Sequence, residues 1–371
     1  MNPLVELHAF GQSFWYDNIR RQFLLDGEVQ RLIDEDGLRG MTSNPTIFEG
    51  AIGGCEDYDA QIAELAALGA NVETIYEALA LADIQAACDL FAPLYESSGG
   101  ADGFVSLEVS PHLAHETGET VREARRLHEA VGRPNVMIKV PATPEGIPAI
   151  RQLTGEGINV NITLMFNMAH YEAVAHAYID GLRALLARGG DPRQVASVAS
   201  FFVSRVDTVV DKQLAALDDP AAAALMGKTA VANSRLVYQR YKEIFRSAAG
   251  EFADLAAAGA PVQRLLWAST GTKNKAYSDT LYIDELIGPD TVTTMPPATI
   301  DAFRHHGTVA NTLEKDLDEA QQVFDHLAEL RIDVDTLTEQ LQVDGVAAFI
   351  KSFDSLLNTI AAKRDALTAE R

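Results

Sequence analysis

The sequence of 371 residues has little cysteine, few basic residues and no continuous apolar run of the length that a membrane span needs. Its two cysteines, Cys55 and Cys88, have no metal-binding spacing and cannot build a disulfide framework, which indicates a reducing compartment. Thirty Lys and Arg against 53 Asp and Glu give a formal net charge of −23, which argues against binding to nucleic acid or to an anionic membrane. Because the first residues also lack the basic start and apolar run of a secretory signal, we expect a cytoplasmic protein.

Several motifs that mark cofactor and metal enzymes are also absent, namely GxGxxG, the P-loop, HExxH and GxSxG. The nearest approach to a set of metal ligands is four histidines, which we interpret as loop or surface residues: His112, His115, His305 and His306. We therefore expect neither a metal nor an organic cofactor. Any chemistry then has to come from the side chains of the protein itself.

The sequence does contain a regular alternation of short apolar runs with longer helical patterns. Eight runs are expected to be strands: 12–17, 38–43, 104–109, 136–140, 158–164, 195–203, 262–269 and 291–295. Helical patterns follow them, such as 119–131, in which apolar residues recur on one face before Gly132 and Pro134. Eight strands that each precede a helix predict an α/β fold, a parallel (β/α)8 TIM barrel rather than a doubly wound sheet.

Two connections, 49–102 and 205–264, are too long for one helix each, so additional helices are expected in both. The tail from about residue 308 onward has a helical pattern, and its last apolar residues have the spacing of one buried face: Phe349, Phe353, Leu356 and Ile360. Docking of this tail on the barrel is favoured over binding of a partner, and a long helix there could also cover the mouth of a site. With 47% hydrophobic residues and no low-complexity segment, residues 1–371 are expected to form a single domain.

The most informative charge in the sequence is Lys139, which lies within the apolar run Val136–Pro141. In a strand, Lys139 shares a face with Met137, and Pro141 ends the strand just beyond it. Taken alone, a lysine at a strand end most often extends its amine into solvent. A buried amine instead loses the solvation of its charged form, and a neutral amine can attack a carbonyl carbon.

Polar residues at the ends of other strands favour the second interpretation, because chemistry in (β/α)8 barrels occurs at those ends. Glu108 lies in a strand whose flanking residues are apolar, and a carboxylate there needs a partner or a role in proton transfer. Asn161 and Thr163 share one face of another strand. Three further polar side chains end the first two strands: Asp17, Thr42 and Asn44. Asp17 and Asn44 could also simply cap the helices that follow.

Two later segments combine hydroxyl groups with a cation after an apolar run, which is the composition of a phosphate site in such barrels. These segments are 200–205 and 269–273. Each cation has an ordinary alternative, since Arg205 can pair with Asp207 or another acid and Lys273 can be a solvated residue in a turn.

The order and spacing of five segments, between residue 12 and about residue 275, add a more specific indication. They are Thr42-Ser43-Asn44-Pro45, Ser106-Leu107-Glu108-Val109, Ile138-Lys139-Val140-Pro141-Ala142-Thr143, Gly157 to Leu164, and Ser200-Phe201-Phe202 to Arg205. Together they resemble the transaldolases, class I aldolases of the pentose phosphate pathway that work through a Schiff base.

The resemblance implies catalytic roles for four residues. Lys139 would form the imine with the ketose donor, and Asp17 would act as general acid and base when the carbon–carbon bond breaks and forms. Glu108 and Thr163 would move protons through a water molecule.

The resemblance also implies how the substrate is bound. The dihydroxyacetone unit would be held by four residues: Thr42, Asn44, Asn161 and Ser200. Arg205 and Ser269 would hold the distal phosphate. Phe202 favours transfer over release of free dihydroxyacetone if it keeps the pocket dry. The family usually places an arginine where this sequence has Gly271, so Lys273 is expected to supply the second cation.

The implied function is the transfer of a dihydroxyacetone unit from sedoheptulose 7-phosphate or fructose 6-phosphate to glyceraldehyde 3-phosphate or erythrose 4-phosphate. Two alternatives stay open: a Schiff-base fructose 6-phosphate aldolase that releases free dihydroxyacetone, and a barrel that binds sugar phosphates without catalysis. We expect sugar phosphates as partners and a monomer or a homodimer as the assembly.

Overall fold

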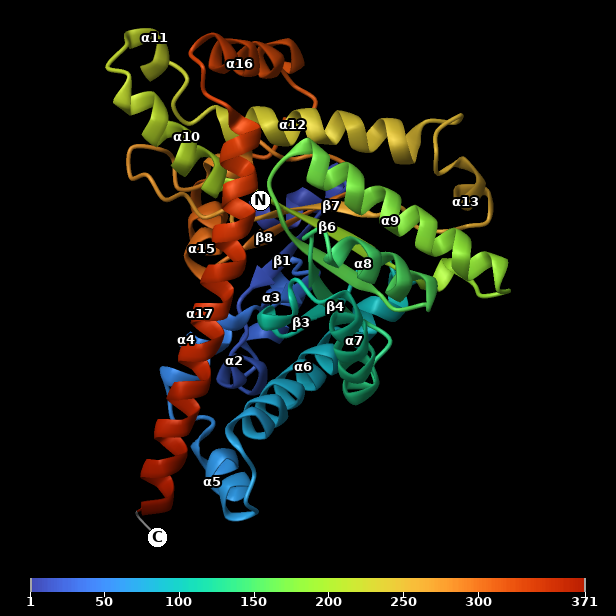
Figure 1. Ribbon diagram of the computed structural model, residues 1–371, viewed down its shortest axis with the longest axis vertical. Helices are drawn as coiled ribbons and strands as arrows, with labels where there is room; N and C mark the ends of the chain where they lie inside the picture. The colour runs from blue at the N-terminus through green and yellow to red at the C-terminus, as the bar shows by residue number, and fades with distance from the viewer. Residues whose placement is uncertain (1, 370–371) are drawn as a thin grey trace.

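The computed structural model describes residues 2–369, and in it eight parallel strands close into a barrel (Figure 1). The strands are β1 (Gln12–Asp17), β2 (Gly40–Thr42), β3 (Phe104–Glu108), β4 (Val136–Pro141), β5 (Val160–Met165), β6 (Ser197–Phe202), β7 (Arg264–Ala268) and β8 (Thr291–Met295). Each strand pairs with the next in sequence, and β8 pairs with β1. The predicted (β/α)8 barrel is therefore confirmed, and every expected strand segment overlaps a strand of the structure.

Helices lie outside the barrel and connect its strands (Figure 1). Those up to β4 are α1 (Pro3–Glu6), η1 (Leu7–Phe10), α2 (Arg21–Leu25), α3 (Glu28–Asp36), α4 (Pro45–Gly53), α5 (Asp59–Ala67), α6 (Val72–Ser97), η2 (Pro111–Leu113) and α7 (Thr117–Val131). Those from β4 to β7 are α8 (Gly146–Gly155), α9 (Met168–Ala187), η3 (Pro192–Gln194), α10 (Ser204–Ala216), α11 (Pro220–Ala223), α12 (Thr229–Tyr241), η4 (Lys242–Arg246) and α13 (Ala253–Ala257). The last are α14 (Leu281–Asp284), α15 (Pro297–His306), α16 (Leu317–Glu329) and α17 (Val334–Ala369). Both long connections contain the additional helices that were expected.

Below the site, a tryptophan side chain fills the space between the first two strands. Trp15 of β1 is fully buried, and it lies so close to Gly40 of β2 that a Cβ at residue 40 would be 2.6 Å from the indole ring. The same Cβ would be 2.8 Å from the Phe104 carbonyl oxygen. Only glycine fits between the indole and the neighbouring strand, so residue 40 has to be a glycine for Trp15 to pack here.

The end of the barrel where the strands begin carries a network of polar groups, beside a cavity of about 460 Å³. Arg264 at the start of β7 donates to Asp102 at 3.0 Å, to the Ser13 hydroxyl at 2.8 Å and to the Thr291 carbonyl. The Ser13 hydroxyl donates in turn to Asp102 at 2.7 Å. Because these charges satisfy each other, this end is suited to stability, and the opposite end is left for chemistry.

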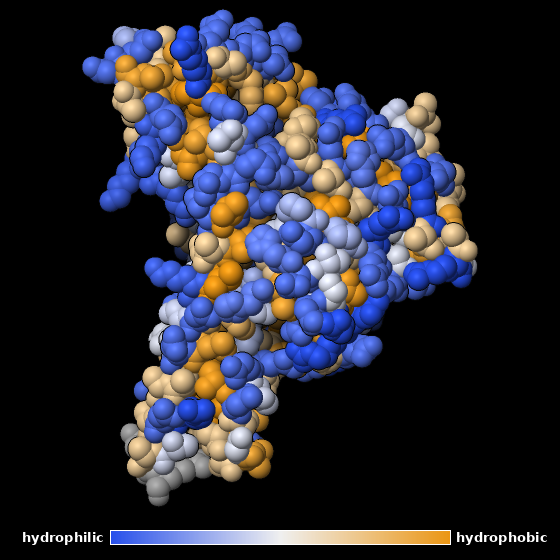
Figure 2. All heavy atoms as spheres, in the orientation of Figure 1, coloured by the Kyte–Doolittle hydropathy of each residue, from blue (hydrophilic) through white to orange (hydrophobic). Residues whose placement is uncertain are grey.

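The long helix α17 runs along one side of the barrel and packs on α4 and α5 (Figure 1). Hydrophobic residues gather along its course on a face that is otherwise mostly hydrophilic (Figure 2). The four residues predicted as one face are all buried: Phe349, Phe353, Leu356 and Ile360. The buried face of α17 is therefore the face that spacing predicted.

Helix α6 contradicts the expectation that no segment is long enough to span a bilayer. By length and composition alone, Val72–Ser97 is long and apolar enough to cross a membrane. The same test is passed by core helices of globular proteins, and α6 buries Ile75, Leu79, Ile84 and Phe91 while contacting β3 and α7.

Candidate active site

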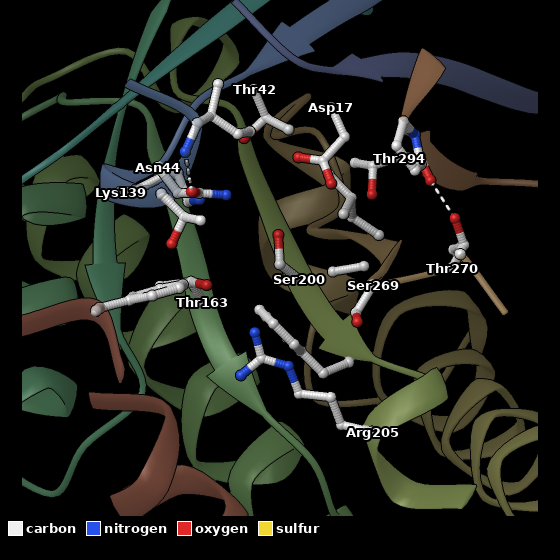
Figure 3. A pocket seen from close by; sticks show the side chains of 18 of the residues that line it. Asp17, Thr42, Asn44, Lys139, Thr163, Ser200, Arg205, Ser269, Thr270 and Thr294 are labelled. Carbon is white, nitrogen blue, oxygen red and sulfur yellow. Dashed lines mark hydrogen bonds between the residues drawn. The ribbon is translucent and has the colours of Figure 1, made fainter. Parts of the chain in front are cut away.

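A cavity of about 300 Å³ opens where the strands end, as barrel chemistry requires. All but two of the residues predicted for the site line it: Asp17, Thr42, Asn44, Lys139, Thr163, Ser200, Phe202, Arg205, Ser269 and Lys273. Figure 3 shows side chains from different strands around this common space, with Asp17 across the cavity from Lys139. The two exceptions, Glu108 and Asn161, lie behind this first layer of residues.

Lys139 is buried, with 5% of its surface exposed, although its side chain reaches the cavity. Its Nζ donates to the Ser43 carbonyl oxygen at 2.9 Å and lies 3.3 Å from Glu108 Oε2. The interpretation of Lys139 as a solvent-exposed strand end is therefore wrong. Register explains the meeting of the two charges, because Glu108 of β3 and Lys139 of β4 are directly paired in the sheet.

Glu108 is also buried, and apart from the contact with Lys139 its Oε2 has no hydrogen-bond partner. Burial raises the pKa of the Glu108 carboxyl above its usual range, while the positive charge of Lys139 opposes this shift. A carboxyl group that holds a proton more readily than usual can accept one from the neighbouring ammonium group. Glu108 therefore places a proton acceptor beside the Lys139 amine.

Asp17 ends β1 at the wall of the cavity. Burial raises the pKa of this carboxyl, and the positive charges of Lys139, Lys273 and Arg205 lower it in part. No cap is formed by Asp17, since the helix that follows begins at Arg21 without a side-chain cap. The alternative that Asp17 is a helix cap is wrong, and its carboxylate is available to a bound substrate.

Asn161 lies behind the cavity in a chain of hydrogen bonds between strands. Its Nδ2 donates to the Ser106 hydroxyl at 3.0 Å, and its Oδ1 accepts from the Ser200 hydroxyl at 2.7 Å. Ser200 lines the cavity, so Asn161 fixes the orientation of that hydroxyl. Thr163, two residues further along β5, lines the cavity with a buried Oγ1 that has no hydrogen-bond partner.

Asn44 has the capping role that was left open and also lines the cavity. It precedes α4, and its Oδ1 accepts from the Ile47 backbone N–H at 3.0 Å. That bond leaves the Nδ2 amide free to donate to another group. Thr42, at the end of β2, is buried and lines the cavity beside it (Figure 3).

The end of the cavity away from Lys139 carries the cations. Arg205 stacks on the Phe202 ring, with its Cζ 5.1 Å from the ring centroid, and among residues 2–369 it forms no ion pair with Asp207 or any other acid. Asp207 instead accepts from the Ala230 N–H and the Tyr282 hydroxyl. Lys273 also lines the cavity, and its side chain is exposed. A free guanidinium and an ammonium at one end of a pocket suit a phosphate group.

Gly271 lies next to these cations and leaves space around its backbone. A Cβ at this position would meet Pro296 and Thr299 only at ordinary contact distances of 3.6 and 3.8 Å. Ser269 lies two residues earlier with φ +55, and its hydroxyl is 3.1 Å from that of Ser204. The short segment from Ser269 to Lys273 therefore presents a hydroxyl, an open backbone and a cation to the cavity.

Several lining residues were not predicted from the sequence. Thr294 of β8 and Phe349 of α17 line the cavity, and the Ser43 carbonyl binds Lys139. Thr294 could have been found by the inward alternation of β8, whereas a backbone acceptor gives no signal in sequence. Phe349 was predicted only as a packing residue. The four histidines considered as ligands are exposed, and no group of three or more metal-binding side chains occurs within residues 2–369.

The fold and the cavity together define a class of protein. A buried lysine beside one carboxyl group and across a cavity from another, at the mouth of a (β/α)8 barrel with cations at the far end, is suited to an enzyme that forms an imine with a phosphorylated carbonyl compound.

Comparison with known proteins narrows this class. A family model described as Transaldolase/Fructose-6-phosphate aldolase matches residues 14–360. A transaldolase of Parafrankia sp. (strain EAN1pec) is 49% identical, with 96% of this chain and 97% of the relative covered. A transaldolase of Thiobacillus denitrificans is 48% identical, with 97% and 100% covered, and one of Trichodesmium erythraeum is 46% identical, with 99% of each covered. The chain belongs to the transaldolase/fructose-6-phosphate aldolase family.

Proposed function

We propose that the chain is a transaldolase, a transferase that passes a dihydroxyacetone unit between sugar phosphates in the non-oxidative pentose phosphate pathway. The donor is sedoheptulose 7-phosphate or fructose 6-phosphate, and the acceptor is glyceraldehyde 3-phosphate or erythrose 4-phosphate. The observation that carries the proposal is the position of Lys139, buried between the Ser43 carbonyl and Glu108 while its side chain reaches the cavity.

The reaction begins at the amine. Glu108 takes a proton from the ammonium group, and Nζ of Lys139 attacks C2 of the ketose. The hydroxyl of the resulting carbinolamine leaves as water after protonation, with Glu108 and Thr163 relaying protons through a bound water molecule. The product is an iminium ion that can accept an electron pair from the bond between C3 and C4.

Cleavage and transfer then depend on Asp17. Its carboxylate takes the proton of the C4 hydroxyl, the bond between C3 and C4 breaks, and the bonding electrons form an enamine on Lys139. The aldose phosphate leaves. When an acceptor aldehyde enters, the enamine carbon attacks its C1, Asp17 returns the proton to the new hydroxyl group, and hydrolysis of the iminium releases the new ketose and the amine.

The remaining residues of the cavity bind the substrate. We assign the hydroxyl groups of the three-carbon unit to Thr42, Asn44 and Ser200, with Asn161 holding Ser200 in place. The phosphate is assigned to Arg205, Ser269 and Lys273. Phe202 packs on Phe166, with ring centroids 5.1 Å apart, and excludes water from the wall between the two ends of the cavity.

Borohydride trapping tests the central step. Reduction in the presence of fructose 6-phosphate is expected to add a three-carbon unit to the peptide that contains Lys139, as read by mass spectrometry. The Lys139→Met variant should show no adduct, whereas Lys273→Met, which leaves the amine in place, should be labelled. If Lys139 stays unmodified in folded protein that is saturated with fructose 6-phosphate, the proposal is rejected. The remaining hypothesis would then be a barrel that binds sugar phosphates without catalysis.

A second measurement separates transferase from aldolase. With fructose 6-phosphate alone, a transferase should release about one equivalent of aldose phosphate per active site and then stop. Sustained turnover should require erythrose 4-phosphate, because the aldose phosphate released from fructose 6-phosphate is glyceraldehyde 3-phosphate and its return only reforms the donor. Continued release of free dihydroxyacetone, far above one equivalent, would make the chain a fructose 6-phosphate aldolase.

The proposal includes a cytoplasmic location, one domain spanning residues 1–371, and an assembly no larger than a homodimer. Light scattering of the purified protein tests the assembly. Activity that persists after treatment with a chelator is the expected result for chemistry carried by the side chains of the cavity alone.

A further inference from the structure

Helix α17 reaches the catalytic end of the barrel through one buried polar side chain, Gln342. This residue is 6% exposed, and its Nε2 donates to two backbone carbonyls, those of Ala142 and Leu164, each at 3.0 Å. Ala142 follows β4 and Leu164 lies near the end of β5. Both hydrogens of one buried amide group are therefore used to join the ends of two neighbouring strands.

These two strand ends carry the reacting groups. Lys139 lies three residues before Ala142, and Thr163 immediately precedes Leu164. The Ala142 backbone N–H donates to the Thr163 carbonyl at 2.8 Å. Together with the two bonds from the Gln342 amide, it links the backbone at Ala142 to the backbone at Thr163 and Leu164. Because the Thr163 hydroxyl has no hydrogen-bond partner of its own, only the backbone and packing at this point fix where it points.

The backbone that Gln342 holds is strained. Leu164 has φ +63, in the left-handed region that a leucine rarely adopts. The pairing of β5 with β6 is irregular between Ile162 and Met165, which brackets this residue. Such a conformation persists only when its surroundings determine it, and the Gln342 amide is the contact that binds the strained peptide directly.

Other residues on the same face of α17 support that contact. Gly345 lies against the Leu164 side chain so closely that a Cβ there would be 2.8 Å from its Cδ2. One turn before Gln342, the Thr338 hydroxyl and Glu339 accept from the Asn167 amide, which caps α9 just after β5. The spacing of these α17 residues is that of one helical face, so the helix docks on the end of β5 as a rigid surface.

From this geometry, and resting on the proposed function, we propose that Gln342 is a positioning residue for the imine chemistry. By holding the peptide after Thr163 in its left-handed conformation, it keeps the Thr163 hydroxyl directed into the cavity beside Lys139. Gln342 does not touch the substrate. Its loss therefore reduces the rate of the chemical step, and the affinity for the sugar phosphate, which the far end of the cavity supplies, is retained.

The test is a comparison of Gln342→Met with Gln340→Met. Methionine keeps the length of the side chain but cannot donate to either carbonyl. Gln340 is on the same helix, is exposed and donates only to Asp344, so it is a matched control. We expect kcat of Gln342→Met to fall by about 10- to 100-fold, because small misplacements of catalytic groups have effects of this order. The KM for fructose 6-phosphate should stay within about threefold, and Gln340→Met should match the parent protein.

Gln342→Glu provides a second variant with nearly the same shape, and its carboxylate likewise cannot donate to the carbonyls. Folding is checked by circular dichroism at the assay temperature. The inference is overturned if both variants keep the parent kcat, if KM rises as much as kcat falls, or if neither variant folds, since the last two results describe a general structural role. Failure of the parent protein to form the Lys139 adduct would instead reject the proposed function itself.

Discussion

The cavity is lined by a buried hydroxyl group that has no hydrogen-bond partner, that of Thr163. Buried hydroxyl groups are normally hydrogen-bonded, and each exception needs an explanation. Thr163 and Thr154 both have such an unpaired Oγ1, but only Thr163 faces the cavity. An unpaired hydroxyl is therefore a candidate for catalysis only where a substrate can reach it.

Thr163→Val tests this distinction. Valine has nearly the shape of threonine and removes a hydroxyl that makes no hydrogen bond in the free protein, so we expect little loss of stability. If Thr163 relays a proton, kcat should fall by roughly 100-fold, which is the usual size of a general acid–base contribution. Steady-state kinetics and thermal unfolding measure the two effects. Thr154→Val is the control, and equal kcat values for the two variants would remove Thr163 from the mechanism.

Lys273 affects the site through the charge that it places near Asp17. Its positive charge lowers the pKa of Asp17, against a larger increase from burial. Asp17 has to be ionised to accept the C4 proton, so activity is lost when the pH falls through its pKa. Removing the lysine leaves the pKa higher, and the acid limb of the kcat/KM profile should move to higher pH.

Lys273→Met is therefore expected to change two properties at once. The acid limb moves upward, and KM for fructose 6-phosphate rises about fivefold, the effect of losing an exposed ionic contact of about 1 kcal/mol. Lys275→Met is the control, because Lys275 is an exposed lysine of the same loop that does not line the cavity. An unchanged KM in Lys273→Met would show that Lys273 is not the second cation, and identical pH profiles would show that its charge does not act on Asp17.

The strands and most lining residues could be predicted because their signals are local. Lys139 and Thr163 occur at inward positions of strands whose alternation is visible in the sequence, and the barrel rule places their ends together. Their partners could not be predicted in the same way. The contact of Lys139 with the Ser43 carbonyl and the strained φ of Leu164 depend on backbone geometry, which residue types alone do not specify.

The position of helix α17 also could not be predicted from the sequence. Its buried face was predicted from spacing, but spacing does not say which buried residues meet the core and which meet the site. Leu356 is buried away from the cavity, while Phe349, two turns earlier, lines it. Only the position of the helix across the strand ends separates the two.

Phe349→Ala tests whether α17 keeps water from the enamine. The smaller side chain opens the cavity, so we expect more of the bound three-carbon unit to be lost as free dihydroxyacetone, about tenfold more per transfer event. The substitution should also cost roughly 3 kcal/mol of stability. Leu356→Ala is the control, because it removes a buried side chain at similar cost without reaching the cavity. An unchanged ratio of free dihydroxyacetone to transfer product in Phe349→Ala would contradict this role.

The two ends of the barrel divide stability from function. Where the strands begin, Arg264 and Asp102 are paired and joined to Ser13, whereas at the other end Arg205 has no acidic partner among the described residues. At the barrel end where the strands end, α17 supplies contacts instead. It packs on helices from the long connection between β2 and β3, and it binds the ends of β4 and β5. Helix α17 and the strand ends that it binds are therefore distant in sequence but in contact in the fold.

This interdependence predicts that the chain unfolds as one unit. Separation of α17 would leave the Ala142 and Leu164 carbonyls without the donor that they have in the folded chain, so the helix and the barrel should lose structure together. Urea unfolding can be followed by fluorescence of Trp15 and Trp267, which lie in strands, and by circular dichroism, to which α17 contributes. If the helix and the barrel unfold together, the two transitions coincide in midpoint. Loss of helical signal at lower urea than the tryptophan transition would show that α17 is a separate unit, and it would contradict the single domain proposed for residues 1–371.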